Sequence, residues 1–137
     1  MEGARPVSES TGEHYGRLAA SYDENWAVYS EAFNRWMNER ILDQLDLRAD
    51  DRVVDLGCGT GLFSTALATR VSQVVCFDPS SAMLAQVPKT NEALLSIHAS
   101  AEDVASGTVR LPCDHVDAIL IKEALHHVHN RALIFLM

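Results

Sequence analysis

A glycine-rich segment contains the residues whose types and spacing most clearly indicate chemistry. Gly57, Gly59 and Gly61 occupy alternate positions in residues 55–61, which read DLGCGTG. Glycine adopts positive φ without strain and has no Cβ, so a ligand can lie directly against such a backbone. Asp55 ends an apolar run, where an ionised carboxylate is costly unless a cation or hydrogen-bond donors accompany it. We therefore expect a ligand that carries positive charge.

A second carboxylate, Asp78, ends the next apolar run and precedes Pro79. An ionised carboxylate at this position offers two acceptor oxygens to a ligand. The same residue is also suited to cap a helix that begins near Pro79, because Asp is favoured at helix N-termini. The residues alone leave both roles open.

The elements that must position these residues alternate along the chain. Short apolar and β-branched runs predict strands at residues 52–56, 74–77, 94–97 and 116–121. Helical spacing of apolar residues predicts helices at 31–47, 62–71 and 79–87, and the polar segment 98–114 is expected to be a loop. This alternation implies an α/β fold, a Rossmann-like doubly wound parallel sheet that binds ligands beyond the carboxyl ends of its strands.

Composition excludes several classes of protein. The 137 residues are enough for about one domain. Eleven Lys and Arg against nineteen Asp and Glu give a formal net charge of −8, so we expect no nucleic acid partner. Three widely spaced cysteines suggest neither a disulfide framework nor a zinc site, and no segment resembles a signal peptide or a membrane span. We expect a cytoplasmic protein with no bound metal and no membrane partner.

Residues 53–61, VVDLGCGTG, closely resemble the first motif of the class I S-adenosylmethionine-dependent methyltransferases. The cofactor of that family carries an ammonium and a sulfonium group, which suits the carboxylate of Asp55. The resemblance implies that S-adenosyl-L-methionine is the cofactor and that Asp55 helps to hold its amino group. It also implies that the methionine portion of the cofactor lies against Gly57, Cys58, Gly59 and Gly61.

The resemblance also implies roles for residues near the second predicted strand. In the family, an acid at the end of this strand accepts hydrogen bonds from both ribose hydroxyls of the cofactor. In this sequence that acid is Asp78, with Pro79 beside it. Met83 resembles the apolar residue that packs on the adenine.

Residues 100–103 resemble the segment that meets the adenine edge after the third strand. In the family this segment contributes a backbone amide, here that of Ala101, and often an acidic side chain. Many relatives have Asp at the position of Ser100. Whether Ser100, Glu102 or Asp103 meets the exocyclic amine stays open.

Residues 117–128 resemble the fourth-strand motif of the ubiquinone and menaquinone methyltransferase-like group, the methyltransferase type 11 group. The resemblance implies that Lys122 flanks the methionine end of the cofactor. His126 and His127 are substrate-contact candidates, and structural or capping roles are the alternative. Adjacent histidines point in different directions, so they predict no metal site. No residue is assigned as catalytic.

The expected organisation is a disordered segment at residues 1–12 followed by one S-adenosylmethionine-binding domain at 13–137. In this domain a helical cap, 13–50, precedes a partial Rossmann-like core, 51–137, of about four strands. The cap contains Tyr22, a substrate-contact candidate in a segment that resembles the one closing over the cofactor in the family. Family members continue with three further strands. We therefore expect a truncated chain whose fourth strand is an open edge for a partner or for self-association.

The resulting functional hypothesis is methyl transfer from S-adenosylmethionine to a small-molecule acceptor. The alternative is a truncated, non-catalytic module that binds the cofactor or another protein. A nicotinamide-dependent reductase is disfavoured for two reasons. Asp55 would lie near a pyrophosphate, and a dinucleotide fingerprint needs a small residue where this sequence has Leu62.

Overall fold

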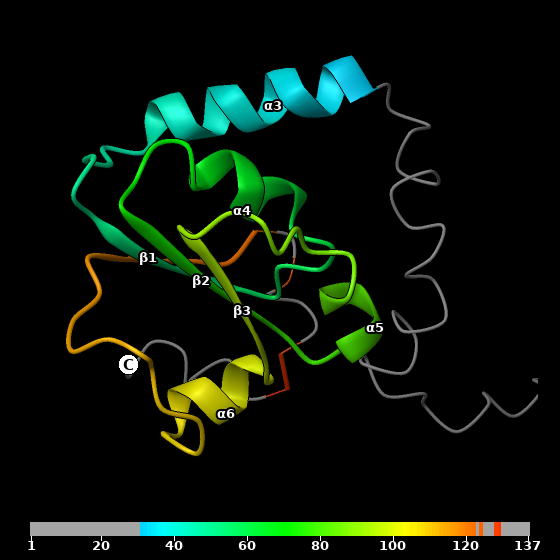
Figure 1. The fold of residues 1–137 in the computed structure, drawn as a ribbon, viewed down its shortest axis with the longest axis vertical. Coiled ribbons are helices and arrows are strands. Elements are labelled where there is room, and N and C mark those ends of the chain that lie inside the picture. The colour runs from blue at the N-terminus through cyan, green and yellow to red at the C-terminus, as the bar shows by residue number, and fades with distance from the viewer. Residues whose placement is uncertain (1–30, 123, 125–127, 130–137) are drawn as a thin grey trace, which may run out of the picture.

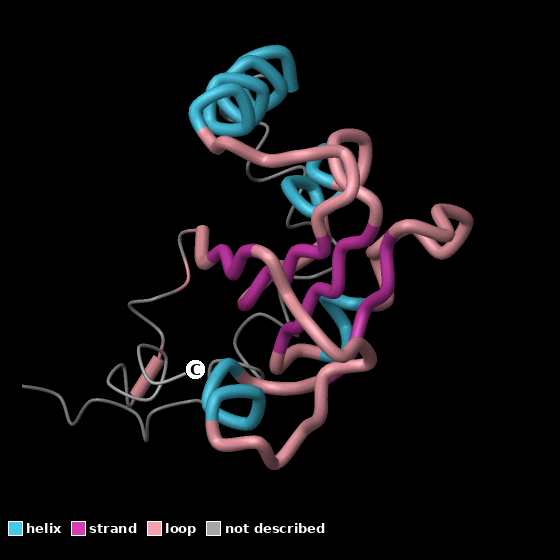
Figure 2. The backbone as a smooth tube through the Cα atoms, turned by 90° about the vertical axis from the view of Figure 1, so that its left-hand side faces the viewer, coloured by secondary structure: helices cyan, strands magenta, loops and turns pink. Residues whose placement is uncertain are grey.

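The structure is a computed structural model that describes residues 31–122, 124, 128 and 129. One parallel sheet forms its middle layer, with α3 and α4 on one face and α6 on the other (Figures 1 and 2). The strands are β1 (Arg52–Leu56), β2 (Gln73–Asp78), β3 (Leu94–His98) and β4 (Ala118–Leu120). The helices are α3 (Glu31–Gln44), α4 (Leu62–Leu67), α5 (Ser81–Leu84) and α6 (Ala101–Ala105).

The four strands lie in the order β3-β2-β1-β4, and every neighbouring pair is parallel. This arrangement confirms the predicted α/β fold with its Rossmann-like parallel sheet. Because parallel strands all end at the same edge of a sheet, the residues that follow β1 and β2 come together there. The register pairs Asp55 with Cys76 on one side and with Leu120 on the other.

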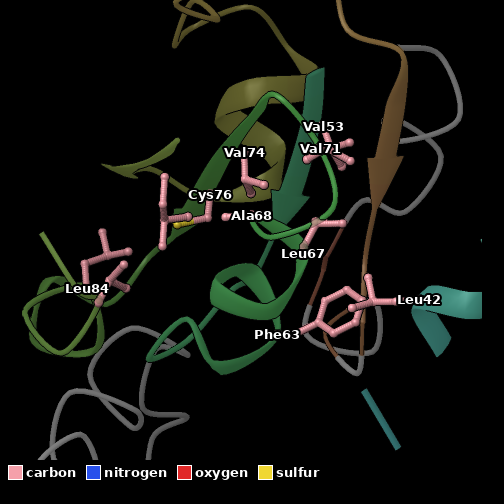
Figure 3. Packing of buried hydrophobic residues seen from close by; sticks show 11 residues of the cluster. Leu42, Val53, Phe63, Leu67, Ala68, Val71, Val74, Cys76 and Leu84 are labelled. Carbon is pink, nitrogen blue, oxygen red and sulfur yellow. The ribbon is translucent and has the colours of Figure 1, made fainter. Parts of the chain in front are cut away.

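Alternate residues of the central strands fill two hydrophobic clusters, one on each face of the sheet. Val53, Val74 and Cys76 face the helices α3 and α4, where Leu42 and Phe63 join the same cluster (Figure 3). The opposite face buries a second cluster, made of Val54, Leu56, Val75, Phe77, Ala99 and Val104. Complete burial of such a side chain stabilises a fold by roughly 1.5 to 3 kcal/mol, so the two clusters fix the sheet between its helices.

The predicted helices after β1 and β2 are shorter than expected. The amides of Thr69 and Arg70 bond to carbonyls three residues back, at Ala66 and Leu67, so α4 continues as a tighter turn and not as an α-helix. The amides of Gln86 and Val87 make the same kind of bond after α5. The apolar spacing therefore located both helices but overestimated their length.

The segment that was expected to be a loop after β3 contains the short helix α6. The Ser100 hydroxyl accepts a hydrogen bond from the Asp103 amide, and the Asp103 carboxylate accepts one from the Ser100 amide, each across 3.1 Å. This reciprocal pair is a capping box, which stabilises the first turn of a helix. The prediction of a continuous loop from 98 to 114 was wrong because this signal was missed.

Strand β4 spans three residues, fewer than the six predicted. Its approach to β1 is fixed by two bonds between residues 52 and 117: the Arg52 amide donates to Asp117 Oδ2, and the Asp117 amide donates to the Arg52 carbonyl. Within the described part of the chain, β4 pairs with β1 alone and forms an edge of the sheet. None of the described helices has the length and apolarity needed to cross a bilayer.

Candidate functional site

The two chemical motifs of the sequence meet at the carboxyl ends of β1 and β2. Residues 57–61, here called the glycine loop, connect β1 to α4. The amides of Gly57 and Cys58 both donate to the Phe77 carbonyl, across 2.8 and 3.0 Å. A further bond inside the loop joins the Gly61 amide to the Cys58 carbonyl across 3.1 Å. These bonds hold the loop against the end of β2.

The three glycines of the loop all have positive φ but differ in their surroundings. A Cβ added to Gly57 would lie 2.5 Å from the Cβ of Ala124, and one added to Gly61 would lie 3.0 Å from Cγ2 of Val87. A Cβ added to Gly59, where φ is +60°, would meet nothing within 4 Å. Two glycines are therefore enclosed by the protein itself, while Gly59 faces open space.

Asp78 lies directly beside Gly59. Its Oδ2 accepts a hydrogen bond from the Gly59 amide across 2.9 Å, and its Oδ1 accepts one from the Ser80 amide across 2.8 Å. The N-cap of α5 is Ser80, whose hydroxyl accepts a hydrogen bond from the Met83 amide. Asp78 is therefore not the N-cap residue of this helix. These bonds fix the buried carboxylate beside the open face of Gly59.

Asp55 lies at the base of the glycine loop and is 2% exposed. Its Oδ2 accepts a hydrogen bond from the Ser64 hydroxyl of α4 across 2.5 Å. Burial raises the pKa of Asp55 to about 6, against the lowering effects of the Ser64 hydrogen bond and the Lys122 charge. The Lys122 ammonium also lies 5.6 Å from the centre of the Phe63 ring. Burial thus moves the ionisation of Asp55 from the ordinary carboxyl range to about pH 6.

The residues predicted to contact ribose and adenine follow β2 and β3. Met83 is almost completely buried, and the Pro79 carbonyl lies 2.9 Å from Nε2 of His98 at the end of β3. Glu102 accepts a hydrogen bond from the His129 amide across 2.7 Å. Ala101 is half-buried in the first turn of α6.

Two residues of the site were not singled out from the sequence. Ser64 is completely buried and positions Asp55, and its signal is a polar residue on the apolar side of a predicted helix. His98 contacts the turn after β2 from the neighbouring strand, and the sequence offers no signal for that contact. The remaining candidates, Tyr22, His126 and His127, lie outside the described residues.

Comparison with known proteins supports the relationship that the motif indicated. Residues 53–136 match a protein family described as a methyltransferase domain. A 75-residue stretch is 48% identical to the 23S rRNA (uracil(1939)-C(5))-methyltransferase RlmD of Salmonella choleraesuis (strain SC-B67), covering 55% of this chain and 16% of that protein. Another, of 74 residues, is 40% identical to the malonyl-(acyl-carrier protein) O-methyltransferase of Methylovorus sp. (strain MP688), covering 50% of this chain and 25% of that protein.

A solved structure shares the fold. The crystal structure of an S-adenosylmethionine dependent methyltransferase from Mesorhizobium loti superposes with a TM-score of 0.57 and is 30% identical. The match covers 71% of this chain and 44% of that one. The chain therefore spans a quarter or less of the two curated relatives and under half of this solved chain.

Proposed function

This chain belongs to the methyltransferase-domain family, whose match spans residues 53–136, and from this premise we propose that it binds S-adenosylmethionine for methyl transfer. The observation that carries the proposal is the open space at Gly59 beside the buried carboxylate of Asp78. Any side chain at position 59 would occupy the space that a ligand needs.

The described residues suit this cofactor chemically. We propose that the ribose hydroxyls donate hydrogen bonds to the carboxylate of Asp78, because an ionised acceptor makes stronger hydrogen bonds than a neutral one does. Asp55 would provide negative charge for the cofactor's ammonium group. Met83 stays the candidate for the adenine contact, although its side chain is almost completely buried in this structure. Ala101 would contribute its backbone amide to the adenine edge. The charge of Lys122 lowers the pKa of Asp55, so the two side chains lie near each other. This supports a position for Lys122 near the methionine end of the cofactor.

Methyl transfer from S-adenosylmethionine requires little of the protein except that it hold the reacting groups in position. S-adenosylmethionine supplies a methyl group already activated by its sulfonium, with a neutral thioether as leaving group. The task of this chain is to orient the reacting groups and to exclude water. We assign no general base, and we keep Tyr22, His126 and His127 as candidates for substrate contact.

We propose a small-molecule acceptor. The formal net charge of −8 supports this choice, because a polyanionic nucleic acid would be repelled on average. One relative is nevertheless named for rRNA methylation and another for methylation of a malonyl group on a carrier protein. An acceptor panel should therefore include RNA and carboxylic acids. The three free cysteines support a cytoplasmic, reducing location.

Among the described residues, β4 pairs with a strand on one side only, and this supports a proposal about the partners of the chain. An edge strand presents unpaired amide and carbonyl groups, and Ile119 on β4 is 39% exposed. We propose that a partner chain or a second copy pairs with this edge. Sedimentation of the purified chain tests this, because a monomer at all concentrations would contradict self-association.

Calorimetric titration with S-adenosylmethionine and S-adenosylhomocysteine tests the cofactor proposal. Wild-type protein should bind, while Asp78→Ala and Gly59→Val should lose binding with their circular dichroism spectra unchanged. Failure of folded wild-type protein to bind either ligand would contradict the proposal. Radiolabelled methyl transfer to the acceptor panel then separates an enzyme from the alternative, a module that binds cofactor without turnover.

A further inference from the structure

Two cysteines that are distant in the sequence come together under the glycine loop. Cys58 belongs to the loop and Cys76 to β2. The Cys58 amide donates to the carbonyl of Phe77, the residue after Cys76, across 3.0 Å. Cys76 is a member of the buried cluster on the α4 face, and the side chain of Cys58 packs against that cluster. Figure 3 shows the Cys76 side chain within the cluster.

The two side chains therefore share one face of the sheet and pack on the same buried cluster. The Cys58 thiol lies 3.6 Å from the Gly59 carbonyl oxygen. The two cysteines differ in accessibility. Cys58 is half-buried, whereas Cys76 is completely buried. The third cysteine, Cys113, is half-buried in the segment between α6 and β4 and belongs to neither hydrophobic cluster.

We propose that Cys58 and Cys76 form a reversible disulfide that switches off the cofactor site. The proposal rests on the proposed function, because the affected site is the one assigned to S-adenosylmethionine. A disulfide requires Cα atoms about 4.4 to 6.8 Å apart and side chains that point toward each other. The direct backbone contact between the loop and the end of β2 favours the first requirement, and the packing of both side chains on one cluster favours the second.

The oxidant that fits this arrangement is a small-molecule disulfide such as oxidised glutathione. The partly exposed Cys58 loses its proton and attacks one sulfur of the small disulfide, which releases one thiolate and leaves a mixed disulfide on Cys58. Cys76 then attacks the Cys58 sulfur as a thiolate and releases the second small thiol. The two protein thiols are oxidised, the small disulfide is reduced to two thiols, and the two protons pass to those thiols.

The local chemistry supports the role of Cys76 as the second nucleophile. The neighbouring Cys58 thiol lowers the pKa of the Cys76 thiol, while the Cys76 thiol and burial raise the pKa of Cys58. The first attack is therefore slow, because little Cys58 thiolate is present, and the closing attack is favoured by proximity, since both side chains pack on one cluster. This order predicts that the switch responds to sustained changes in redox potential.

Formation of the bond must move the glycine loop. A disulfide places its sulfur atoms about 2 Å apart, well inside the contact separation of two sulfur atoms that are not bonded. Gly59 follows Cys58 directly, and its amide is bonded to Asp78. A shift of Cys58 toward β2 therefore disturbs the open face of Gly59 and the carboxylate beside it. By reciprocity, bound cofactor should also oppose formation of the disulfide.

The test equilibrates the full chain in glutathione buffers of increasing oxidised fraction. Tryptic cleavage after Arg70, Lys89 and Arg110 places the three cysteines in separate peptides, 53–70, 71–89 and 111–122, so mapping identifies each cross-link. We expect a link between the first two peptides and a decrease of about tenfold or more in affinity for S-adenosylhomocysteine. Dithiothreitol should restore the affinity, and saturating S-adenosylhomocysteine should shift cross-linking to more oxidising buffers.

Two variants control the experiment. Cys113→Ser retains both proposed partners and should respond as the wild type does, whereas Cys76→Ala should form no cross-link and should instead accumulate the mixed disulfide of glutathione on Cys58. If Cys76→Ala does not fold, the peptide map of the wild type still decides whether the cross-link forms. In the wild type, separate glutathione adducts without the cross-link, or a cross-link that leaves affinity unchanged, would overturn the inference. Reduced wild-type protein that binds no cofactor would instead overturn the proposed function, whatever the map shows.

Discussion

The Gly59 amide donates a hydrogen bond to Oδ2 of Asp78 across 2.9 Å, which joins the glycine loop to the end of β2. The glycine loop and the Asp78 segment, which lie apart in the sequence, thus form one structural unit. Gly59 provides the open space, and Asp78 provides the buried acceptor beside it. A change at either residue should therefore affect both the loop conformation and any ligand bound there.

Asp78→Asn tests the proposed ribose contact. The substitution removes the charge and one acceptor oxygen, while the side chain keeps its size. Hydrogen bonds to charged groups contribute roughly 1.5 to 3 kcal/mol, so we expect the affinity for S-adenosylhomocysteine to fall by about 10- to 100-fold. Calorimetric titration measures the change.

A matched ligand separates the ribose contact from general damage to the loop. The 2′-deoxy analogue of S-adenosylhomocysteine lacks one of the two hydroxyl donors. Wild-type protein should bind the analogue more weakly, and Asp78→Asn should distinguish the two ligands much less. Equal discrimination by both proteins would show that Asp78 does not contact the ribose.

Gly59→Ala tests the open space of the loop, and Gly107→Ala is its matched control. Both glycines have positive φ, +60° and +78°, and a Cβ at either position meets nothing within 4 Å. Each substitution should therefore destabilise the fold by about 1 to 2 kcal/mol through backbone strain alone. Only Gly59→Ala should weaken cofactor binding, as measured by titration alongside urea denaturation. An equal loss of affinity in both variants would refute a specific role for Gly59.

Much of this arrangement followed from local patterns in the sequence. Strand β1 ends at the glycines because three of them interrupt an apolar, β-branched run. The alternation of strands and helices then places Asp55 and Asp78 at one edge of a parallel sheet. Patterns of this kind depend on residues close together in the chain, so they can be recognised without a structure.

The unpredicted features depend on contacts between distant residues or on weak local signals. The enclosure of Gly57 by Ala124 and of Gly61 by Val87 arises from packing between segments far apart in the sequence. The contact of His98 with the Pro79 carbonyl has the same origin. Helix α6 is only five residues long, and its apolar pattern is too short to show a helical period.

Asp55→Asn should change how stability depends on pH. The pKa of Asp55 is raised by burial from an ordinary value of 3.8 to about 6. Between these values the folded protein holds a proton that the unfolded chain has released, so this group's contribution to stability falls as pH rises. The Asn variant has no carboxyl group to ionise at this position. Its free energy of unfolding, relative to that of the wild type, should therefore rise by about 3 kcal/mol from about pH 3 to about pH 7. Urea denaturation across this range measures the difference.

Cofactor affinity should show the opposite dependence on pH. A ligand ammonium favours the ionised form of Asp55, so the affinity of the wild type should decrease as pH falls below about 6. Ser64→Ala removes a hydrogen bond that lowers this pKa and should move the midpoint to higher pH. A midpoint that Ser64→Ala leaves unchanged would contradict the assignment of this transition to Asp55.

Ser100→Ala asks which group meets the adenine edge. Ser100 and Asp103 are bonded to each other in the capping box, so we expect the adenine to be met by backbone groups. Loss of the cap should reduce stability by about 1 kcal/mol with little change in affinity. Asp103→Ala removes the other side chain of the capping box and should cause a similar loss of stability, also with little change in affinity. A large loss of affinity in either variant would identify that side chain as an adenine contact.

Gly57→Ala probes the contact between the glycine loop and the chain after β4. The new Cβ would lie 2.5 Å from that of Ala124 at a backbone φ of +75°. Backbone strain of about 1 to 2 kcal/mol and overpacking of about 1 to 3 kcal/mol should therefore combine. Ala124→Gly removes the clash but not the strain, so the double variant should recover the overpacking part. Additive losses in this double-mutant cycle, measured by urea denaturation, would show that the two residues are not in contact.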